Sequence, residues 1–211
     1  MEMFSAIRSS TLGITLFAVV TAALIAVTQV STKERIAKNE RDAQARALYE
    51  IVPKSTIDND MLEDTVSFVA PELLGHDQPA DAYLARKDGK VVAVILPVVA
   101  PDGYSGNINM IVGVKRDGSV AGVRVLAHKE TPGLGDKVDL KKSGWILGLN
   151  NQRNDNDQRD SFAVLKDGGR FDQFTGATIT PRAVVGATSR ALDYFRTNKA
   201  ALLEPAITGA E

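Results

Sequence analysis

The sequence predicts an α+β protein, in which an antiparallel β-sheet domain with packed helices is preceded by one N-terminal transmembrane helix. Three observations lead to this prediction. An apolar run near the N-terminus is long enough for a membrane span, and the middle of the chain holds short β-prone runs separated by Asp-Gly turns. Apolar residues at helical spacing follow near the C-terminus, which is typical of helices that cover a sheet.

The apolar run lies between Ser9 and Thr32, where no charged residue occurs. A helix of about 20 apolar residues spans a bilayer. A cleaved signal peptide is the alternative, but its apolar core is usually shorter, roughly 7–15 residues. We therefore expect a short tail at residues 1–8 and an uncleaved transmembrane helix at residues 9–32.

A charged helix is expected to follow the span. Ser31 or Thr32 is suited to cap its N-terminus, and Pro53 ends it because proline cannot donate a helical hydrogen bond. This predicts a stalk or docking helix over residues 33–52. Lys and Arg are more frequent after the span than before it, which by the positive-inside rule favours a cytoplasmic C-terminal domain.

The composition excludes several kinds of chemistry. Cysteine is absent, which rules out disulfides, thiolate-bound iron–sulfur clusters and cysteine nucleophiles. His76 and His128 are the only histidines, so we expect no metal site. The formal net charge of -1 gives no reason to expect a nucleic-acid partner. If the protein handles electrons, a bound organic cofactor has to carry them.

The folded domain is predicted at residues 53–205, with a C-terminal tail at 206–211. Turn sequences at 87–89 and 116–118, each ending in Asp-Gly, predict two β-hairpins. Predicted strands occupy 82–86, 90–96, 108–115, 119–127, 161–165 and 170–174. Helices are predicted at 141–149 and 181–203, a polar surface loop at 150–160, and a short helix with loops at 55–80.

Three threonines surround Gly176 directly before the last predicted helix, in the segment 172–181. Thr180 is expected at the N-cap and Pro181 at the first helical position. Because a helix N-terminus offers free N–H groups and a favourable dipole, this segment can bind a phosphate, with Arg182 as the nearest cation. A strand-to-helix turn with an ordinary threonine cap is the alternative.

The segment 128–136 follows a predicted strand and contains the turn-forming sequence Pro-Gly-Leu-Gly. Such a loop offers backbone amides and the apolar Leu134 to a flat ligand, for example an isoalloxazine or a quinone. Three interpretations of His128 and Glu130 stay open. They form a general acid/base pair, or an exposed ion pair, or they bond the backbone of their own loop.

Together, two motifs resemble the covalent FMN-binding domain of the Rnf and Nqr membrane electron-transport complexes. They are His-x-Glu-Thr-Pro-Gly-Leu-Gly at 128–135 and Thr-Gly-Ala-Thr at 175–178. The Gly-Tyr-Ser-Gly loop at 103–106 and the single N-terminal span also resemble this family. The short chain is more similar to the G subunits of Rnf complexes than to the longer C subunits of Nqr complexes. Thr175 stands where many members have serine, a change that keeps the hydroxyl.

The resemblance implies that FMN is bound covalently, through its phosphate, as a phosphoester on Thr178. A separate flavin transferase makes this bond with FAD, and Asp172 belongs to the stretch that it recognises. Residues 128–135 are then expected to line the flavin ring, with Thr131, Gly133, Leu134 and Gly135 in contact with it, and Glu130 to have a structural or electrostatic role. Besides Thr178, the expected cofactor-binding residues are Tyr104, His128, Glu130, Thr131, Gly133, Leu134, Gly135, Thr175, Gly176, Ala177 and Thr180.

The function implied by the resemblance is an electron relay in an ion-translocating ferredoxin:NAD oxidoreductase complex, without catalysis by this subunit alone. Its partners are the other membrane and iron–sulfur subunits, the flavin transferase and membrane lipid. The alternatives are the equivalent subunit of a sodium-pumping NADH:quinone complex and a cofactor-free assembly module. The family also implies a single-pass protein of the bacterial inner membrane with a periplasmic FMN domain, against the charge rule. Residues 33–46 carry charges of both signs, which weakens that rule here.

Overall fold

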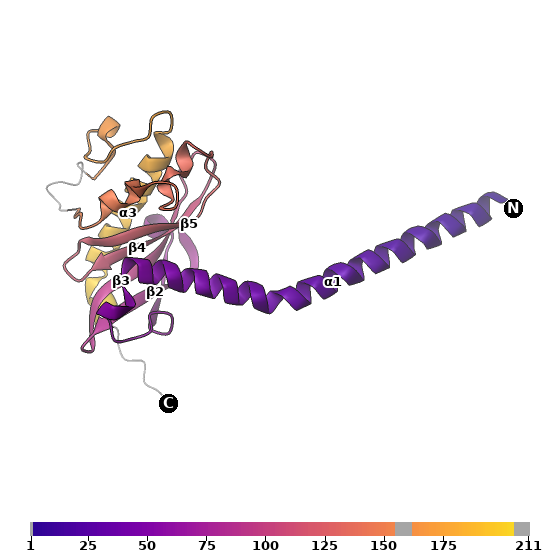
Figure 1. Ribbon diagram of the computed structural model, residues 1–211, viewed down its shortest axis with the longest axis horizontal. Coiled ribbons are helices and arrows are strands. Elements are labelled where there is room, and N and C mark those ends of the chain that lie inside the picture. Colours follow the sequence, from indigo (N-terminus) through magenta and orange to yellow (C-terminus); the bar gives the residue numbers. More distant parts are fainter. Residues whose placement is uncertain (1, 155–161, 205–211) are drawn as a thin grey trace. The chain divides into compact units, whose positions relative to one another are not determined.

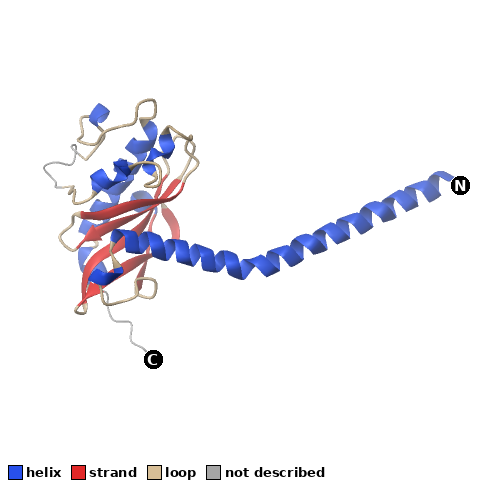
Figure 2. Cartoon of the chain, in the orientation of Figure 1, coloured by secondary structure: helices blue, strands red, loops and turns tan. Residues whose placement is uncertain are grey.

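The computed structural model describes residues 2–154 and 162–204 (Figures 1 and 2). The chain divides into two units, Met1–Gln44 and Ala45–Glu211. The second unit contains a five-stranded antiparallel sheet with helices. The predicted α+β class with one N-terminal apolar helix is therefore confirmed.

The first unit is helical. Helix α1 covers Glu2–Ile51, and its stretch Thr11–Lys33 is long and apolar enough to cross a membrane. No N-cap occurs at Ser31 or Thr32, so that prediction was wrong. The Thr32 hydroxyl instead donates to the Thr28 carbonyl at 2.7 Å, because a threonine inside a helix can bond the preceding turn.

The sheet has the order β1-β2-β3-β4-β5, and every neighbouring pair is antiparallel. Both predicted hairpins are present, since β2 pairs with β3 around 87–90 and β4 pairs with β5 across the 116–118 turn. The strands are β1 Thr65–Ala70, β2 His76–Lys87, β3 Lys90–Ala100, β4 Ile108–Lys115 and β5 Val120–Ala127.

The region 55–80 differs from the prediction of a short helix with loops. It contains the short 3-10 helix η1 (Lys54–Thr56), strand β1, the one-turn helix α2 (Pro71–Leu74) and the first part of β2. Strand β1 alternates between exposed and buried positions, but it is only six residues long and buries only Phe68 and Ala70, so the pattern is short. Pro79 is tolerated in β2 because it lies where the register of the β1–β2 pair shifts.

Three further local predictions were wrong. The predicted strands at 161–165 and 170–174 are replaced by the 3-10 helix η5 (Leu165–Asp167) and two isolated bridges, Val164 with Phe171 and Phe174 with Ala177; Ser161 lies outside the described residues. The predicted helix at 141–149 is the 3-10 helix η3 (Gly144–Leu149). Glycine lies between the two predicted strands, at 168 and 169, and inside the predicted helix, at 144 and 148, where it disfavours regular structure. Of the predicted surface loop, 155–160 lies outside the described residues.

Helix α3 (Ile179–Thr197) and the short helix α4 (Lys199–Leu203) follow the sheet in sequence. The N-cap of α3 is Thr178 and not Thr180, and the predicted helix 181–203 is interrupted at Asn198. Figure 1 shows α3 along one face of the sheet. Its buried side chains there include Val184, Ala187, Ala191, Leu192 and Phe195.

Both faces of the sheet are covered within the second unit. Alternate residues of β3 point to opposite faces, so Val94 and Leu96 pack with α3 whereas Ile95 packs in a second cluster. That second cluster contains the last turn of α1, with Leu48 completely buried. The end of the apolar N-terminal helix is therefore part of the core of the β-sheet unit. The predicted boundary at residue 53 stays a prediction.

Candidate functional site

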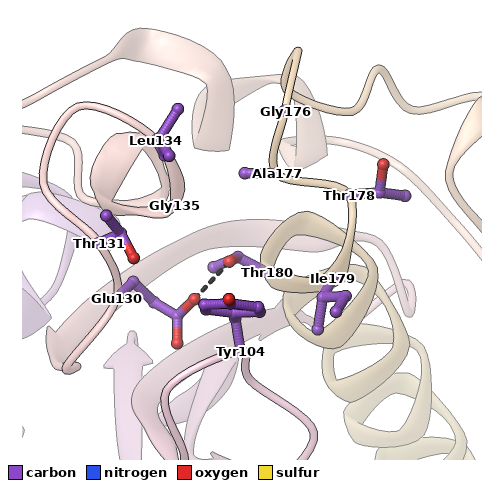
Figure 3. Close-up of a pocket in the computed structure, with 10 residues that line it drawn as sticks. All are labelled: Tyr104, Glu130, Thr131, Leu134, Gly135, Gly176, Ala177, Thr178, Ile179 and Thr180. Atoms are coloured by element: carbon purple, nitrogen blue, oxygen red, sulfur yellow. Dashed lines mark hydrogen bonds between the residues drawn. The ribbon is translucent and has the colours of Figure 1, made fainter.

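A cavity of about 310 Å³ lies within the second unit where three chain segments meet (Figure 3). These segments are the loop between β3 and β4, the loop that follows β5, and the turn that leads into α3. Its volume lies at the lower end of the range of small-molecule sites, which is about 300–1,000 Å³. The lining residues are Tyr104, Glu130, Thr131, Leu134, Gly135, Gly176, Ala177, Thr178, Ile179 and Thr180.

The threonine segment forms a tight turn directly before α3. The Ala177 amide donates to the Phe174 carbonyl at 3.1 Å, and Gly176 has a φ of 82°, a conformation that favours glycine. Thr178 then occupies the N-cap of α3, where its hydroxyl makes no capping hydrogen bond. The turn therefore presents the Thr178 side chain at the wall of the cavity with its hydroxyl available for another bond.

Aromatic contacts hold this turn on the domain. The Trp145 indole N–H donates to the Asp172 carbonyl at 2.7 Å, and the rings of Trp145 and Phe174 meet edge to face at 5.1 Å. The ammonium group of Lys137 lies 6.0 Å from the centre of the Phe174 ring. The segment before Thr178 is thus fixed by side chains from two separate 3-10 regions, η2 (Gly135–Val138) and η3.

Arg182 does not serve as a free cation for a phosphate. Its guanidinium forms a two-pronged ion pair with Asp167, with a distance of 2.7 Å between Nη2 and Oδ1. The Arg182 hydrogen bond also holds the pKa of the Asp167 carboxyl below its usual value. The remaining attraction for an anion comes from the first turn of α3. The backbone N–H groups of Ile179 and Thr180 have no hydrogen-bond acceptor within the helix, as is general for a helix N-terminus.

The loop after β5 is compact. The Thr131 carbonyl accepts hydrogen bonds from the amides of Leu134 and Gly135, both at 3.1 Å. The Asp136 carboxylate accepts a further bond from the Gly133 amide at 2.8 Å. These contacts leave the Leu134 side chain 42% exposed at the cavity, where it can contact an apolar ligand surface.

His128 and Glu130 form neither an acid/base pair nor an exposed ion pair. The His128 ring nitrogen Nδ1 accepts a hydrogen bond from the Glu130 backbone amide at 3.1 Å. For His128 this is the third of the predicted interpretations, a side chain that bonds the backbone of its own loop. The Glu130 side chain is only 4% exposed, and its carboxylate contacts Ser105 and Thr180. The two side chains therefore have separate partners.

Nine of the expected residues line the cavity, and three do not. Thr175, His128 and Gly133 lie outside the lining, although they belong to the same two loops. Thr180 lines the cavity, but its hydroxyl donates to Glu130 because the first turn of α3 directs this nearly buried side chain inward. Ile179 lines the cavity and was missed; its place as the apolar residue next to Thr178 is the signal that identifies it.

No group of three or more Asp, Glu, His or Cys side chains suited to a metal ion occurs within residues 2–154 and 162–204. The cavity is instead lined by apolar groups, hydroxyls and backbone amides, with one carboxylate. This donor set suits an organic ligand that has a flat apolar part and an anionic end.

Comparison with known proteins agrees with this geometry. Residues 103–193 match the FMN-binding domain family, and residues 1–51 match the RnfG N-terminal region. The relatives compared are each named as the G subunit of an ion-translocating oxidoreductase complex. The one from Pseudomonas aeruginosa (strain UCBPP-PA14) is 51% identical over 190 residues, which is 90% of this chain and 89% of the relative.

Two relatives from Vibrio extend the match. The protein from Vibrio cholerae serotype O1 (strain M66-2) is 46% identical over 192 residues, 91% of each chain. That of Vibrio atlanticus (strain LGP32) is 43% identical over 210 residues, which is 99% of this chain and 100% of the relative. The resemblance seen in the two motifs is thereby confirmed, and the chain belongs to the G-subunit family of ion-translocating oxidoreductase complexes.

Proposed function

We propose that this protein is a membrane-anchored flavoprotein that relays electrons within an Rnf-type ferredoxin:NAD oxidoreductase complex. It carries FMN as a phosphoester on Thr178. The observation that supports this most directly is the position of Thr178, at the N-cap of α3 and on the wall of the cavity. The relatives' shared name supports a role in an ion-translocating complex.

The residues present fit FMN. The N-terminal amides of α3 suit the phosphate, since a helix N-terminus stabilises negative charge. Exposed apolar side chains at the cavity, from Tyr104, Leu134 and Ile179, suit the flat ring system. FMN supplies the redox chemistry, while the protein supplies binding, orientation and the local electrostatic field.

The ester linkage is a maturation step by a separate flavin transferase that uses FAD. The bond that forms joins Thr178 Oγ1 to the phosphorus on the flavin side of FAD. The bond from that phosphorus to the AMP part breaks, and the hydroxyl proton is released. A cofactor attached in this way cannot dissociate, which suits an electron relay that fails if its flavin is lost.

The test uses the full-length chain, produced together with a flavin transferase. The denatured protein is expected to fluoresce as a flavoprotein in a gel, and a peptide that contains Thr178 to carry the mass of FMN. Thr178→Val removes the hydroxyl and is expected to abolish both signals. Thr197→Val, at the exposed C-terminal end of the same helix, is the matched control and keeps them. Wild-type protein without flavin fluorescence, or flavin fluorescence in Thr178→Val, would contradict the proposal.

The location of the domain is part of the proposal. The apolar stretch Thr11–Lys33 anchors the protein in the bacterial inner membrane, in contact with lipid and with the complex's other membrane and iron–sulfur subunits. The FMN domain lies on the periplasmic side. A reporter that is active only in the periplasm, fused after Glu211, is expected to be active. Activity of a reporter that works only in the cytoplasm, fused at the same position, would contradict the proposed orientation.

A further inference from the structure

We propose that Glu130 is the positioning residue of the cavity. Its carboxylate joins the Tyr104 loop (residues 101–107) to the first turn of α3, and it places one negative charge at the cavity wall. The effect on the cofactor rests on the proposed function, whereas the contacts of Glu130 are made between residues of the protein and do not involve a cofactor.

Both oxygens of the Glu130 carboxylate accept a hydrogen bond from a different segment. Oε1 accepts from the Ser105 amide at 2.9 Å, and Oε2 accepts from the Thr180 hydroxyl (Figure 3). Glu130 itself belongs to the loop after β5. One side chain therefore connects all three segments that form the cavity, and it does so 25 residues from Ser105 and 50 residues from Thr180 in sequence.

The backbone is shaped to let this carboxylate approach. A Cβ atom on Gly135 would lie 2.9 Å from Glu130 Oε2 and 2.6 Å from Thr180 Oγ1. A Cβ atom on Gly103 would lie 2.2 Å from the Gly106 carbonyl oxygen of its own loop and 3.1 Å from Glu130 Oε1. Because both positions are glycine, the carboxylate lies in space that a side chain at either position would enter.

The Tyr104 loop depends on this contact. Residues 101, 102 and 104–107 are exposed, and the Tyr104 side chain, which lines the cavity, is 68% exposed. An exposed loop has little apolar burial to order it, so a charge-assisted hydrogen bond to a buried acceptor has a large effect on its conformation. Glu130 thus sets the distance between Tyr104 and α3.

The charge of Glu130 is not balanced by an ion pair. Within the described part of the chain, the salt bridges join other residues, and the groups that contact the Glu130 carboxylate are an amide and a hydroxyl. In a partly desolvated cavity a negative charge opposes the addition of an electron to a nearby group. Glu130 is therefore expected to lower the reduction potential of a flavin held there.

The test compares four substitutions in the full-length protein. Glu130→Gln keeps the shape of the side chain but removes its charge. It also turns an N–H₂ group toward either the Ser105 amide or the Thr180 hydroxyl, both of which donate to the carboxylate in the wild type. Glu50→Gln is the matched control, because it makes the same chemical change at an exposed ion pair with Arg124. Thr180→Val removes one donor to Glu130, and Thr180→Ser restores the hydroxyl.

The first measurement needs no cofactor. In protein made without the transferase, hydrogen exchange of the Ser105 amide is measured by NMR. Glu130→Gln is expected to accelerate this exchange at least tenfold, whereas Glu50→Gln and Thr180→Ser keep the wild-type rate. If Glu130→Gln does not fold, Thr180→Val is the test, and it is expected to accelerate the exchange as well. A wild-type rate in the folded variant overturns the positioning role.

The second measurement uses protein loaded with flavin. Glu130→Gln is expected to retain FMN on the Thr178 peptide but to raise the midpoint potential. The expected change is tenfold in the ratio of reduced to oxidised flavin, which corresponds to about 30 mV for a two-electron couple. An unchanged potential overturns the electrostatic part. Wild-type protein without FMN overturns the proposed function instead, and leaves the exchange result standing.

Discussion

Leu48 tests whether the last turn of α1 belongs to the core of the β-sheet unit. Its side chain is completely buried and packs with Ile51, Met61, Ile95 and Ile111 in the cluster on the face of the sheet opposite α3. Leu48→Ala removes three carbon atoms from this cluster and leaves a cavity. Substitutions of this kind cost about 2–5 kcal/mol in the free energy of unfolding.

This cost is converted into a melting temperature through the size of the unit. For a domain of about 150–250 residues, 1 kcal/mol lowers the melting temperature by about 2–4 °C. Leu48→Ala is therefore expected to lower it by roughly 4–20 °C. The single tryptophan, Trp145, lies in the second unit, so its fluorescence during heating follows this unit without a signal from the first unit.

Leu165→Ala is the matched control, because Leu165 is 51% exposed in the same unit. A substitution at such a surface position usually changes stability by less than about 0.5 kcal/mol. If Leu48→Ala melts within a degree or two of Leu165→Ala, the last turn of α1 does not contribute to the core. The folded domain would then start after this helix, as the boundary at residue 53 predicts.

Two further predictions concern the cavity and acid stability. Gly135→Ala places a methyl group 2.6 Å from the Thr180 hydroxyl, so we expect a loss of about 1–3 kcal/mol in urea unfolding, whereas Gly144→Ala, with no atom within 4 Å, serves as control. Equal effects of the two substitutions would refute the close packing at Glu130. Hydrogen bonds from Ser119, then the contact with Arg153, hold the pKa of the Asp117 carboxyl below its usual range. Because the folded-state pKa is lowered, this contribution is present above about pH 4 and is lost as the pH falls further. Asp117→Asn is therefore expected to show a smaller acid-induced fall in melting temperature than the wild type; parallel curves would refute this.

The sequence predicted well those elements that depend on local chemistry. Strand β4 was predicted with its observed bounds, because a nearly continuous apolar run and an Asp-Gly turn act within a few residues. Strand β1 was missed, since its alternating pattern covers only six residues of an edge strand and includes only two buried side chains. The N-cap of α3 was misplaced by two residues because Pro181 is accommodated in the first turn without being its first residue.

For the site, the sequence by itself determined the two motifs that resemble the FMN-binding family, and the family comparisons confirmed that resemblance. Local sequence shows turn formers, hydroxyls and a helix start, because these act over neighbouring residues. Only the tertiary structure decided the partners of Glu130, the inward direction of the Thr180 hydroxyl and the neutralisation of Arg182 by Asp167. Each of these contacts joins segments that are 15–50 residues apart, and the packing of the sheet against α3 brings them together.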